Sequence, residues 1–112
     1  MKTFPETPYR VVFCTCPNHD VAQEIAGALV EARLAACVNI VPGIQSVYRW
    51  QGKIEKDDEL LLVIKTRQER IPELQRMIRQ RHPDEVPEII ALPIASGSPA
   101  YLAWLGAEVG LG

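Results

Sequence analysis

The sequence predicts an α+β domain in which two helices cover one face of a four-stranded antiparallel sheet, with a further helix at the C-terminus. Strand-like and helix-like segments follow one another in the order β-α-β-β-α-β-α. Two long extended segments, 37–50 and 53–66, are separated only by Gln51 and Gly52, which is the spacing of a β-hairpin. The 112 residues, 47% hydrophobic and 23% charged, have the size and balance of one globular domain.

The chain begins with a segment that has no periodic pattern. Residues 1–8 contain two prolines, so we expect a loose leader there and a single domain over residues 1–112. Residues 9–16 are rich in β-branched and aromatic side chains, which predicts the first strand.

Apolar residues at helical spacing follow the first strand. We expect this helix to begin near Asn18 or Asp20, because Asp20 and Gln23 have the spacing of a capping box. The periodic pattern predicts that it ends near Ala35.

The hairpin of residues 37–66 is long for a chain of this size. Fourteen extended residues reach about 45 Å, whereas the radius of gyration expected here is about 13 Å. We therefore expect the hairpin to project from its own subunit and contact a neighbour. Pro42 and Gly43 predict a bulge in its first strand, since proline cannot donate to a ladder. Its turn requires positive φ at Gln51, and glutamine adopts positive φ less readily than asparagine does.

The C-terminal half supplies a helix, a strand and a last short helix. Residues 67–81 predict the helix, with Pro72 in its first turn, where a missing N–H is harmless. Residues 88–94 predict the strand, and residues 99–109 predict the final helix, with Pro99 at its first position. The complete order is that of the ferredoxin-like split βαβ fold (βαββαβ) plus a C-terminal helix.

The predicted strands are apolar on both faces. Residues 11–14, 60–64 and 89–92 have no polar alternation, although a sheet with one wet face should alternate. Leaving even 600 Å² of apolar sheet in water forfeits about 15 kcal/mol at ~25 cal/mol per Å². The last helix could cover this face in a monomer, but at about 16 Å it is too short to cover all of it. We therefore expect an oligomer.

Composition argues against several functions. The net charge of −2 gives no electrostatic reason to expect nucleic-acid binding. We expect no signal peptide and no membrane span, because no apolar run approaches about 20 residues. Three cysteines without a disulfide framework favour reduced thiols in the cytoplasm. No glycine-rich phosphate loop or nucleophile motif is present, so we expect neither an enzyme nor an organic cofactor.

Several long motifs over residues 9–109 resemble one family, the CutA divalent-cation tolerance proteins. The motifs are VVFCTCPN, ARLAACVNIVPGIQSVYRWQGKIE, VIKT, HPDEVPEIIALPI, and the pairs Tyr101-Leu102 and Trp104-Leu105. The resemblance implies a ferredoxin-like subunit in a tight homotrimer similar to PII proteins, a cytoplasmic location, and a link to copper, as Cu(II), or another divalent cation. It implies no known enzymatic activity.

The resemblance also implies a metal site at Cys14 and His82. Thiolate and imidazole suit copper or zinc. This chain departs from the family at two positions: Asp84 replaces a frequent aromatic residue, and Arg81 stands where some members have a second histidine. Further ligands would come from Cys16, Glu88, Asp84, water or another subunit. The alternative is that Cys14 is a small buried hydrophobe and His82 a helix-terminal residue.

Six residues with polar tips lie in otherwise apolar segments and suggest a cleft between subunits. Lys65 ends a buried strand and needs a partner, for which Glu88 is the obvious candidate. The six residues are Tyr48, Trp50, Lys65, Glu88, Tyr101 and Trp104. They predict either a structural interface or the binding site of a PII-like signalling or scaffold module for a small molecule or an unidentified protein partner.

Overall fold

A computed structural model describes residues 7–110 and confirms the α+β class. The expected leader falls mostly on residues 1–6, which lie outside the described residues. The elements are β1 (Tyr9–Cys16), α1 (His19–Glu31), β2 (Cys37–Trp50), β3 (Lys53–Arg67), the 3-10 turn η1 (Gln68–Arg70), α2 (Ile71–Arg81), β4 (Ile90–Pro93) and α3 (Pro99–Glu108). They occur in the predicted order.

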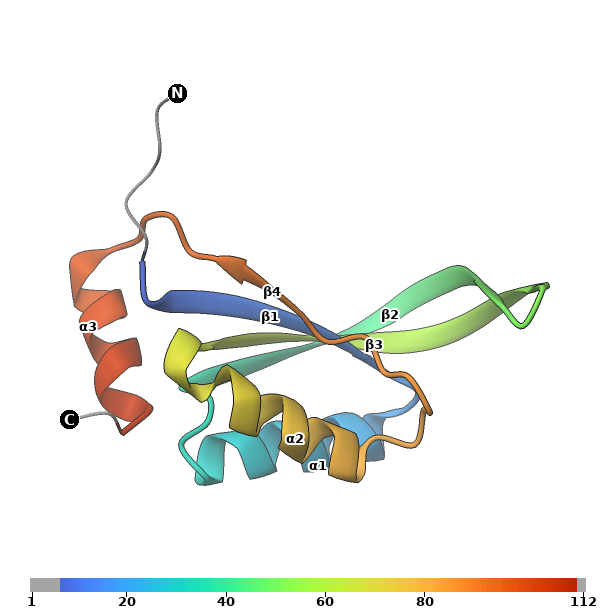
Figure 1. The fold of residues 1–112 in the computed structure, drawn as a ribbon, viewed down its shortest axis with the longest axis horizontal. Helices are drawn as coiled ribbons and strands as arrows, with labels where there is room; N and C mark the ends of the chain where they lie inside the picture. Colours follow the sequence, from blue (N-terminus) through green and yellow to red (C-terminus); the bar gives the residue numbers. More distant parts are fainter. Residues whose placement is uncertain (1–6, 111–112) are drawn as a thin grey trace.

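The four strands form one antiparallel sheet in the order β2-β3-β1-β4. Helices α1 and α2 lie together on one face of this sheet, as the split βαβ topology requires (Figure 1). Helix α3 packs at one end of the sheet, and residues 7–110 leave the face opposite α1 and α2 uncovered (Figure 1). The fourth strand, Ile90–Pro93, is shorter than the expected 88–94.

The β2–β3 hairpin projects beyond the helices, as expected (Figure 1). Its turn has φ of 50° at Gln51 and 81° at Gly52. The register between β2 and β3 shifts between Val41 and Ile44, which confirms the predicted bulge. Gly43, with φ of 78°, supplies the left-handed backbone at that point.

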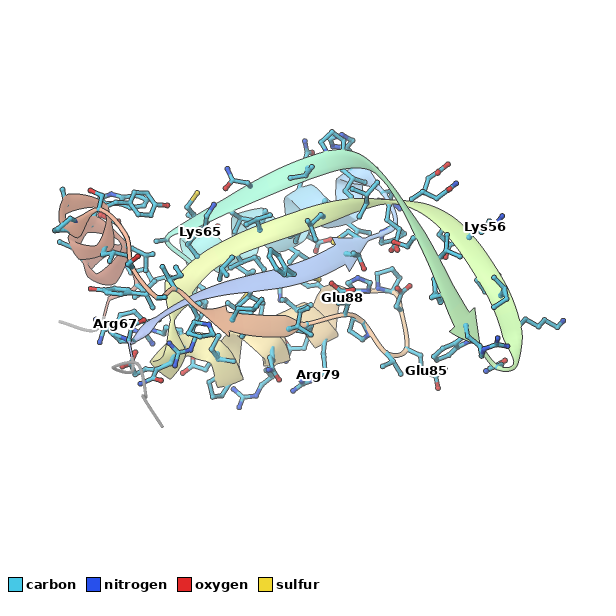
Figure 2. All side chains as sticks on the ribbon, turned by 90° about the horizontal axis from the view of Figure 1, so that it is seen from above. Lys56, Lys65, Arg67, Arg79, Glu85 and Glu88 are labelled. Atoms are coloured by element: carbon cyan, nitrogen blue, oxygen red, sulfur yellow. The ribbon has the colours of Figure 1, made fainter. Side chains whose placement is uncertain are left out.

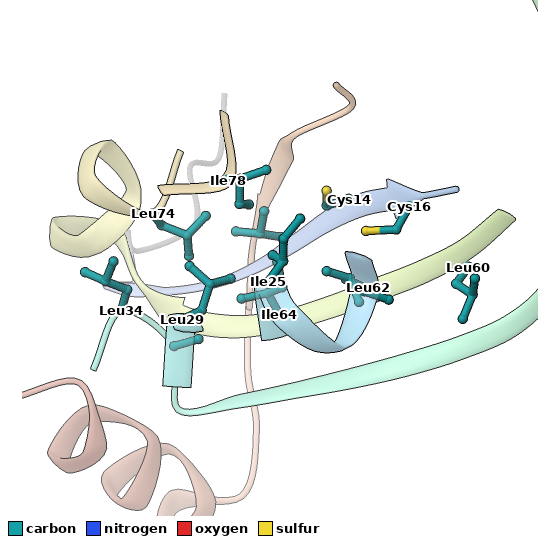
Figure 3. Packing of buried hydrophobic residues seen from close by; sticks show 13 residues of the cluster. Cys14, Cys16, Ile25, Leu29, Leu34, Leu60, Leu62, Ile64, Leu74 and Ile78 are labelled. Atoms are coloured by element: carbon teal, nitrogen blue, oxygen red, sulfur yellow. The ribbon is translucent and has the colours of Figure 1, made fainter. Parts of the chain in front are cut away.

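The core lies between the helices and one face of the sheet (Figure 3). Alternate residues of β1 and β3 point into it, following the two-residue period of a strand. The helices contribute side chains at three- and four-residue spacing. The fully buried core residues include Val12, Cys14, Cys16, Leu62, Ile64, Ile25, Leu29, Leu74 and Ile78.

Helix α1 begins at one of its two expected positions but ends earlier than predicted. Asn18 is the N-cap and accepts a hydrogen bond from the Val21 amide at 2.9 Å, which confirms the start near Asn18, whereas the alternative start with a capping box at Asp20 is wrong. The helix ends at Glu31 rather than near Ala35. The chain leaves it through a residue with φ of 58°, Arg33, and the Leu34 amide donates back to the Leu29 carbonyl at 2.9 Å. These bonds form a Schellman motif, which usually contains glycine.

The uncovered face of the sheet is apolar. Within residues 7–110, two residues of β4 keep a large fraction of their surface exposed to solvent: Ile90 is 51% exposed and Leu92 is 43% exposed. The register places Phe13 beside Ile90 and Val11 beside Leu92, so the apolar surface continues onto β1. The two-sided apolar pattern of the sequence therefore corresponds to one core face and one open face.

Candidate metal-binding cluster and cleft

Two cysteines and a histidine meet at the end of the core. Cys14 and Cys16 are two residues apart on β1, so both side chains point to the helix face. His82 is the C-cap of α2, which lies on that face. One ligand atom from each of the three residues lies within 4.8 Å of the other two. The expected pair of Cys14 and His82 is thus brought together, and Cys16 joins it.

His82 is held by two main-chain groups. Its Nε2 atom lies 2.7 Å from the carbonyl oxygen of Thr15, and the amide of Asp84 donates to Nδ1 at 3.1 Å. Because Nδ1 accepts the hydrogen bond from the Asp84 amide, the ring proton is on Nε2, which donates to the carbonyl oxygen of Thr15. The side chain is fully buried, and a carboxylate oxygen of Asp84 lies 4.0 Å from Nδ1. The neutral ring therefore ties the end of α2 to β1.

The two thiols share a hydrogen bond that separates their pKa values. The bond to Cys16 raises the pKa of Cys14 far above its ordinary value, and burial raises it further. The same bond lowers the pKa of Cys16, although burial opposes this. Cys16 is therefore the sulfur that ionises first.

A separate cavity of about 600 Å³ lies between the hairpin and the segment that precedes β4. This volume is in the range of small-molecule sites. Tyr48, Trp50 and Glu88, three of the six residues expected in a cleft, line it. The other lining residues are Thr15, Ser46, Val47, Glu59, Pro83, Asp84, Glu85 and Val86.

The phenol of Tyr48 donates a hydrogen bond to the carboxylate of Asp57. This bond raises the pKa of Tyr48 to about 12, because ionisation would place two negative charges side by side. The phenol of Tyr48 therefore stays protonated at neutral pH, and the carboxylates of Glu59, Asp84, Glu85 and Glu88 line the same cavity.

The other three expected cleft residues lie elsewhere. Lys65 donates to the side chain of Asn39, with Cys37 Sγ 3.9 Å from its Nζ. The rings of Tyr101 and Trp104 pack against each other with centroids 5.5 Å apart on α3. Within one chain, therefore, Lys65, Tyr101 and Trp104 do not line this cavity, and a cleft between subunits stays a prediction.

Within residues 7–110, Lys65 and Glu88 form no ion pair. Lys65 faces Val11 across the sheet, at the end nearer α3, whereas Glu88 precedes β4 at the cavity (Figure 2). The separation along β1 explains why the expected contact does not form inside one subunit. A contact between subunits stays a prediction.

The fold and the motifs agree with one family. Residues 10–108 match the family model described as CutA1 divalent ion tolerance protein. The chain belongs to the CutA1 family. A divalent-cation tolerance protein CutA of Thermus thermophilus is 55% identical over 100 residues, which cover 89% of this chain and 97% of that relative.

Solved CutA1 structures have the same fold. One from Thermus thermophilus superposes with a TM-score of 0.89 at 54% identity and covers 91% of this chain and 99% of that one. One from Oryza sativa gives 0.90 at 45% identity and covers 96% and 98%. Each comparison spans the sheet, the hairpin and the helices.

Some CutA relatives are longer than this chain. The mouse protein CutA is 56% identical over 93 residues, which cover 83% of this chain and 52% of that relative, so the chain spans about half of its length. A relative from Arabidopsis thaliana is named chloroplastic. In residues 7–110 of this CutA1 chain, no helix combines the length and apolar character that a membrane crossing needs.

Cys16 was predicted only as an optional ligand of the metal site. It was one of several possible additional ligands, although the Cys-x-Cys spacing on a predicted strand already places two sulfurs on one face. The contact between His82 and Thr15 joins residues 67 positions apart and has no local sequence signal. The carboxylates at Glu59 and Glu85 were also missed, because the hairpin and the later loop meet only in the fold.

Proposed function

We propose that this CutA1 chain is a non-enzymatic protein of divalent-cation tolerance that binds copper or a related metal at the cluster formed by Cys14, Cys16 and His82. The observation that supports this most strongly is the group of three buried donor atoms within 4.8 Å. Thiolate sulfur and imidazole nitrogen are ligands of copper and zinc. No organic cofactor is needed for this role.

The donor set fits a soft or borderline metal better than a hard one. Two of the three donors are sulfur, whereas calcium and magnesium select oxygen. A closed zinc site normally has four ligands. Asp84, near His82, or a water molecule would complete the set, and His82 would ligate only after giving up one main-chain bond.

Calorimetry tests metal binding directly. We expect saturable binding of Cu(II) or Zn(II) by the reduced full-length chain, and at least tenfold weaker binding by Cys14→Ala. Cys37→Ala is the matched control, because Cys37 lies at the start of β2 beside Lys65 and outside the cluster. Absence of saturable binding to the unmodified chain would refute the proposal.

We further propose that the protein is a homotrimer whose subunits cover one another's open sheet faces. The supporting observations are the exposed apolar residues Ile90 and Leu92 and the projecting hairpin. Light scattering at micromolar concentration should give about three times the chain mass of 12.5 kDa. A mass equal to one chain would contradict this assembly.

A second candidate function is a PII-like signalling or scaffold module. It is supported by the cavity of about 600 Å³, lined by Tyr48, Trp50 and Glu88, which would bind a small molecule or a partner protein. A metabolite screen by thermal shift tests it: a stabilising compound should lose its effect on Glu88→Gln but not on the control Glu24→Gln, an exposed position on α1.

We propose a cytoplasmic location for the single domain, with neither nucleic acid nor membrane as a partner. Three free cysteines, two of them fully buried, support a reducing compartment. Fractionation of cells that express the full-length protein tests the location. Recovery in a membrane or periplasmic fraction would contradict it.

A further inference from the structure

We propose that the cluster binds a soft monovalent d10 ion, Cu(I) above all, in linear coordination by the sulfurs of Cys14 and Cys16, with His82 outside the ligand set. This inference rests on the proposed metal-binding function and names its ion and geometry. It departs from a divalent site built on a cysteine and a histidine.

Both ring nitrogens of His82 already form hydrogen bonds to the main chain. Its Nε2 proton is donated to Thr15 at 2.7 Å, and its Nδ1 lone pair accepts the Asp84 amide at 3.1 Å. Ligation by either nitrogen would break one of these part-buried hydrogen bonds to the main chain, which is unfavourable. The ring is therefore a positioning residue, which holds the end of α2 against β1.

The sulfurs of Cys14 and Cys16 are close enough to bind one ion together. Both project from the same face of β1, and their Sγ atoms lie within 4.8 Å of each other. Metal–thiolate bonds are about 2.3 Å long, so two opposed bonds span about 4.6 Å. The strand thus holds both sulfurs on one face, closer together than 4.8 Å, and rotation of the two side chains about their Cα–Cβ bonds would place the sulfurs on opposite sides of one ion.

The cluster offers few donor atoms to a metal ion. Within residues 7–110, the group that contains these sulfurs holds only three candidate ligand atoms, and none is a carboxylate oxygen. Once His82 is set aside, two donors remain. A divalent zinc ion takes four ligands, whereas two thiolates satisfy the soft ion Cu(I).

The two sulfurs lie in an apolar environment. Cys14 and Cys16 are both fully buried, beside aliphatic side chains such as Ile25, Leu62 and Ile78 (Figure 3). A two-coordinate ion needs no water, so an apolar environment does not deprive it of ligands. Each thiol loses its proton to solvent as its sulfur–copper bond forms, and no electron is transferred.

The test is an anaerobic titration of the reduced, full-length protein with Cu(I) in competition with a chromophoric Cu(I) chelator. We expect one Cu(I) per chain and copper-edge X-ray absorption that shows two sulfur neighbours and no nitrogen neighbour. Cys16→Ala should weaken binding at least 100-fold. Cys37→Ser, the control outside the cluster, should bind as the unmodified chain does.

Nitrogen NMR of the two histidines, His19 and His82, gives a readout that does not require a variant to fold. Because Cu(I) is diamagnetic, the His82 ring should keep the signals of its neutral, Nε2-protonated form at saturation. A large shift of either His82 nitrogen, or a nitrogen neighbour of copper, would overturn the inference while leaving the proposed metal function standing. Failure of Cu(I), Cu(II) and Zn(II) alike to bind would overturn both.

Discussion

The Nε2 atom of His82 lies 2.7 Å from the carbonyl oxygen of Thr15, which connects the end of α2 to the strand that carries both cluster cysteines. The two residues are 67 positions apart, so this contact holds two distant segments of the chain together. It also fixes the start of the segment that leads past the cavity to β4. One buried ring thus joins the core, the cluster and the cavity wall.

Replacing His82 with alanine should destabilise the chain by about 2–4 kcal/mol. The change breaks the part-buried hydrogen bonds of the Thr15 carbonyl and the Asp84 amide to the ring, and it opens a cavity where the buried ring was. Urea denaturation followed by circular dichroism measures the free energy of unfolding. His19→Ala is the matched control, because His19 is exposed at the start of α1 and should change stability by less than about 0.5 kcal/mol. Equal effects of the two changes would contradict this role of His82.

Replacing Gln51 with asparagine should stabilise the hairpin. Gln51 has φ of 50° and precedes Gly52 at 81°, and Asn-Gly is the favoured pair when both turn residues have positive φ. We expect a gain of about 0.5 kcal/mol, measured as a higher midpoint of urea unfolding. Gln51→Val should have the opposite sign, since a β-branched residue tolerates positive φ poorly. A loss of stability on Gln51→Asn would show that the side chain of Gln51 has another role.

Positive φ angles occur at the turn, at the bulge and at the end of α1, and the residue type at each of them explains which of these features the sequence could predict. Gln51-Gly52 and Pro42-Gly43 carry glycine, and both the turn and the bulge were predicted correctly. The end of α1 was wrong because its left-handed residue is Arg33, whose type gives no such signal. The element order and the two-sided strands depend on local patterns, so they were predictable.

The candidate site was only partly predictable, because its members come from distant segments. Family resemblance and residue chemistry indicated Cys14 and His82. The bonds that occupy both nitrogens of His82 depend on how α2 docks against β1, which no local pattern encodes. The expected Lys65–Glu88 pair does not form within one chain for a similar reason, since the sheet places Lys65 beside Val11 and Glu88 lies at the cavity; a pair between subunits stays a prediction.

The phenol of Tyr48 should titrate with a raised pKa of about 12, against an ordinary value of 10.0. Its hydrogen bond to Asp57 favours the protonated form, so this contribution to stability is present below pH 10 and is lost as pH rises towards 12. The difference in tyrosinate absorbance between the unmodified chain and Tyr48→Phe isolates this group. Asp57→Asn should return the pKa towards 10.0; an unchanged titration would show that the bond is not formed in solution.

A charge on the open face should disrupt the proposed trimer. Ile90 is 51% exposed on β4, and Ile90→Lys would place an ammonium group in the proposed contact between subunits. Light scattering should show a lower mass for this variant at micromolar concentration. Val30→Lys is the control, because Val30 is 44% exposed on α1, on the other side of the sheet, and should leave the mass unchanged. A full trimer mass for both variants would place the interface elsewhere.

The most direct test of metal binding at the cluster is diffraction from crystals of the reduced protein soaked in copper, with data collected on both sides of the copper absorption edge. We predict one strong anomalous peak per chain, within bonding distance of the Sγ atoms of Cys14 and Cys16. No anomalous peak at these sulfurs, with copper found instead at surface carboxylates such as Glu59 and Glu85, would contradict the account.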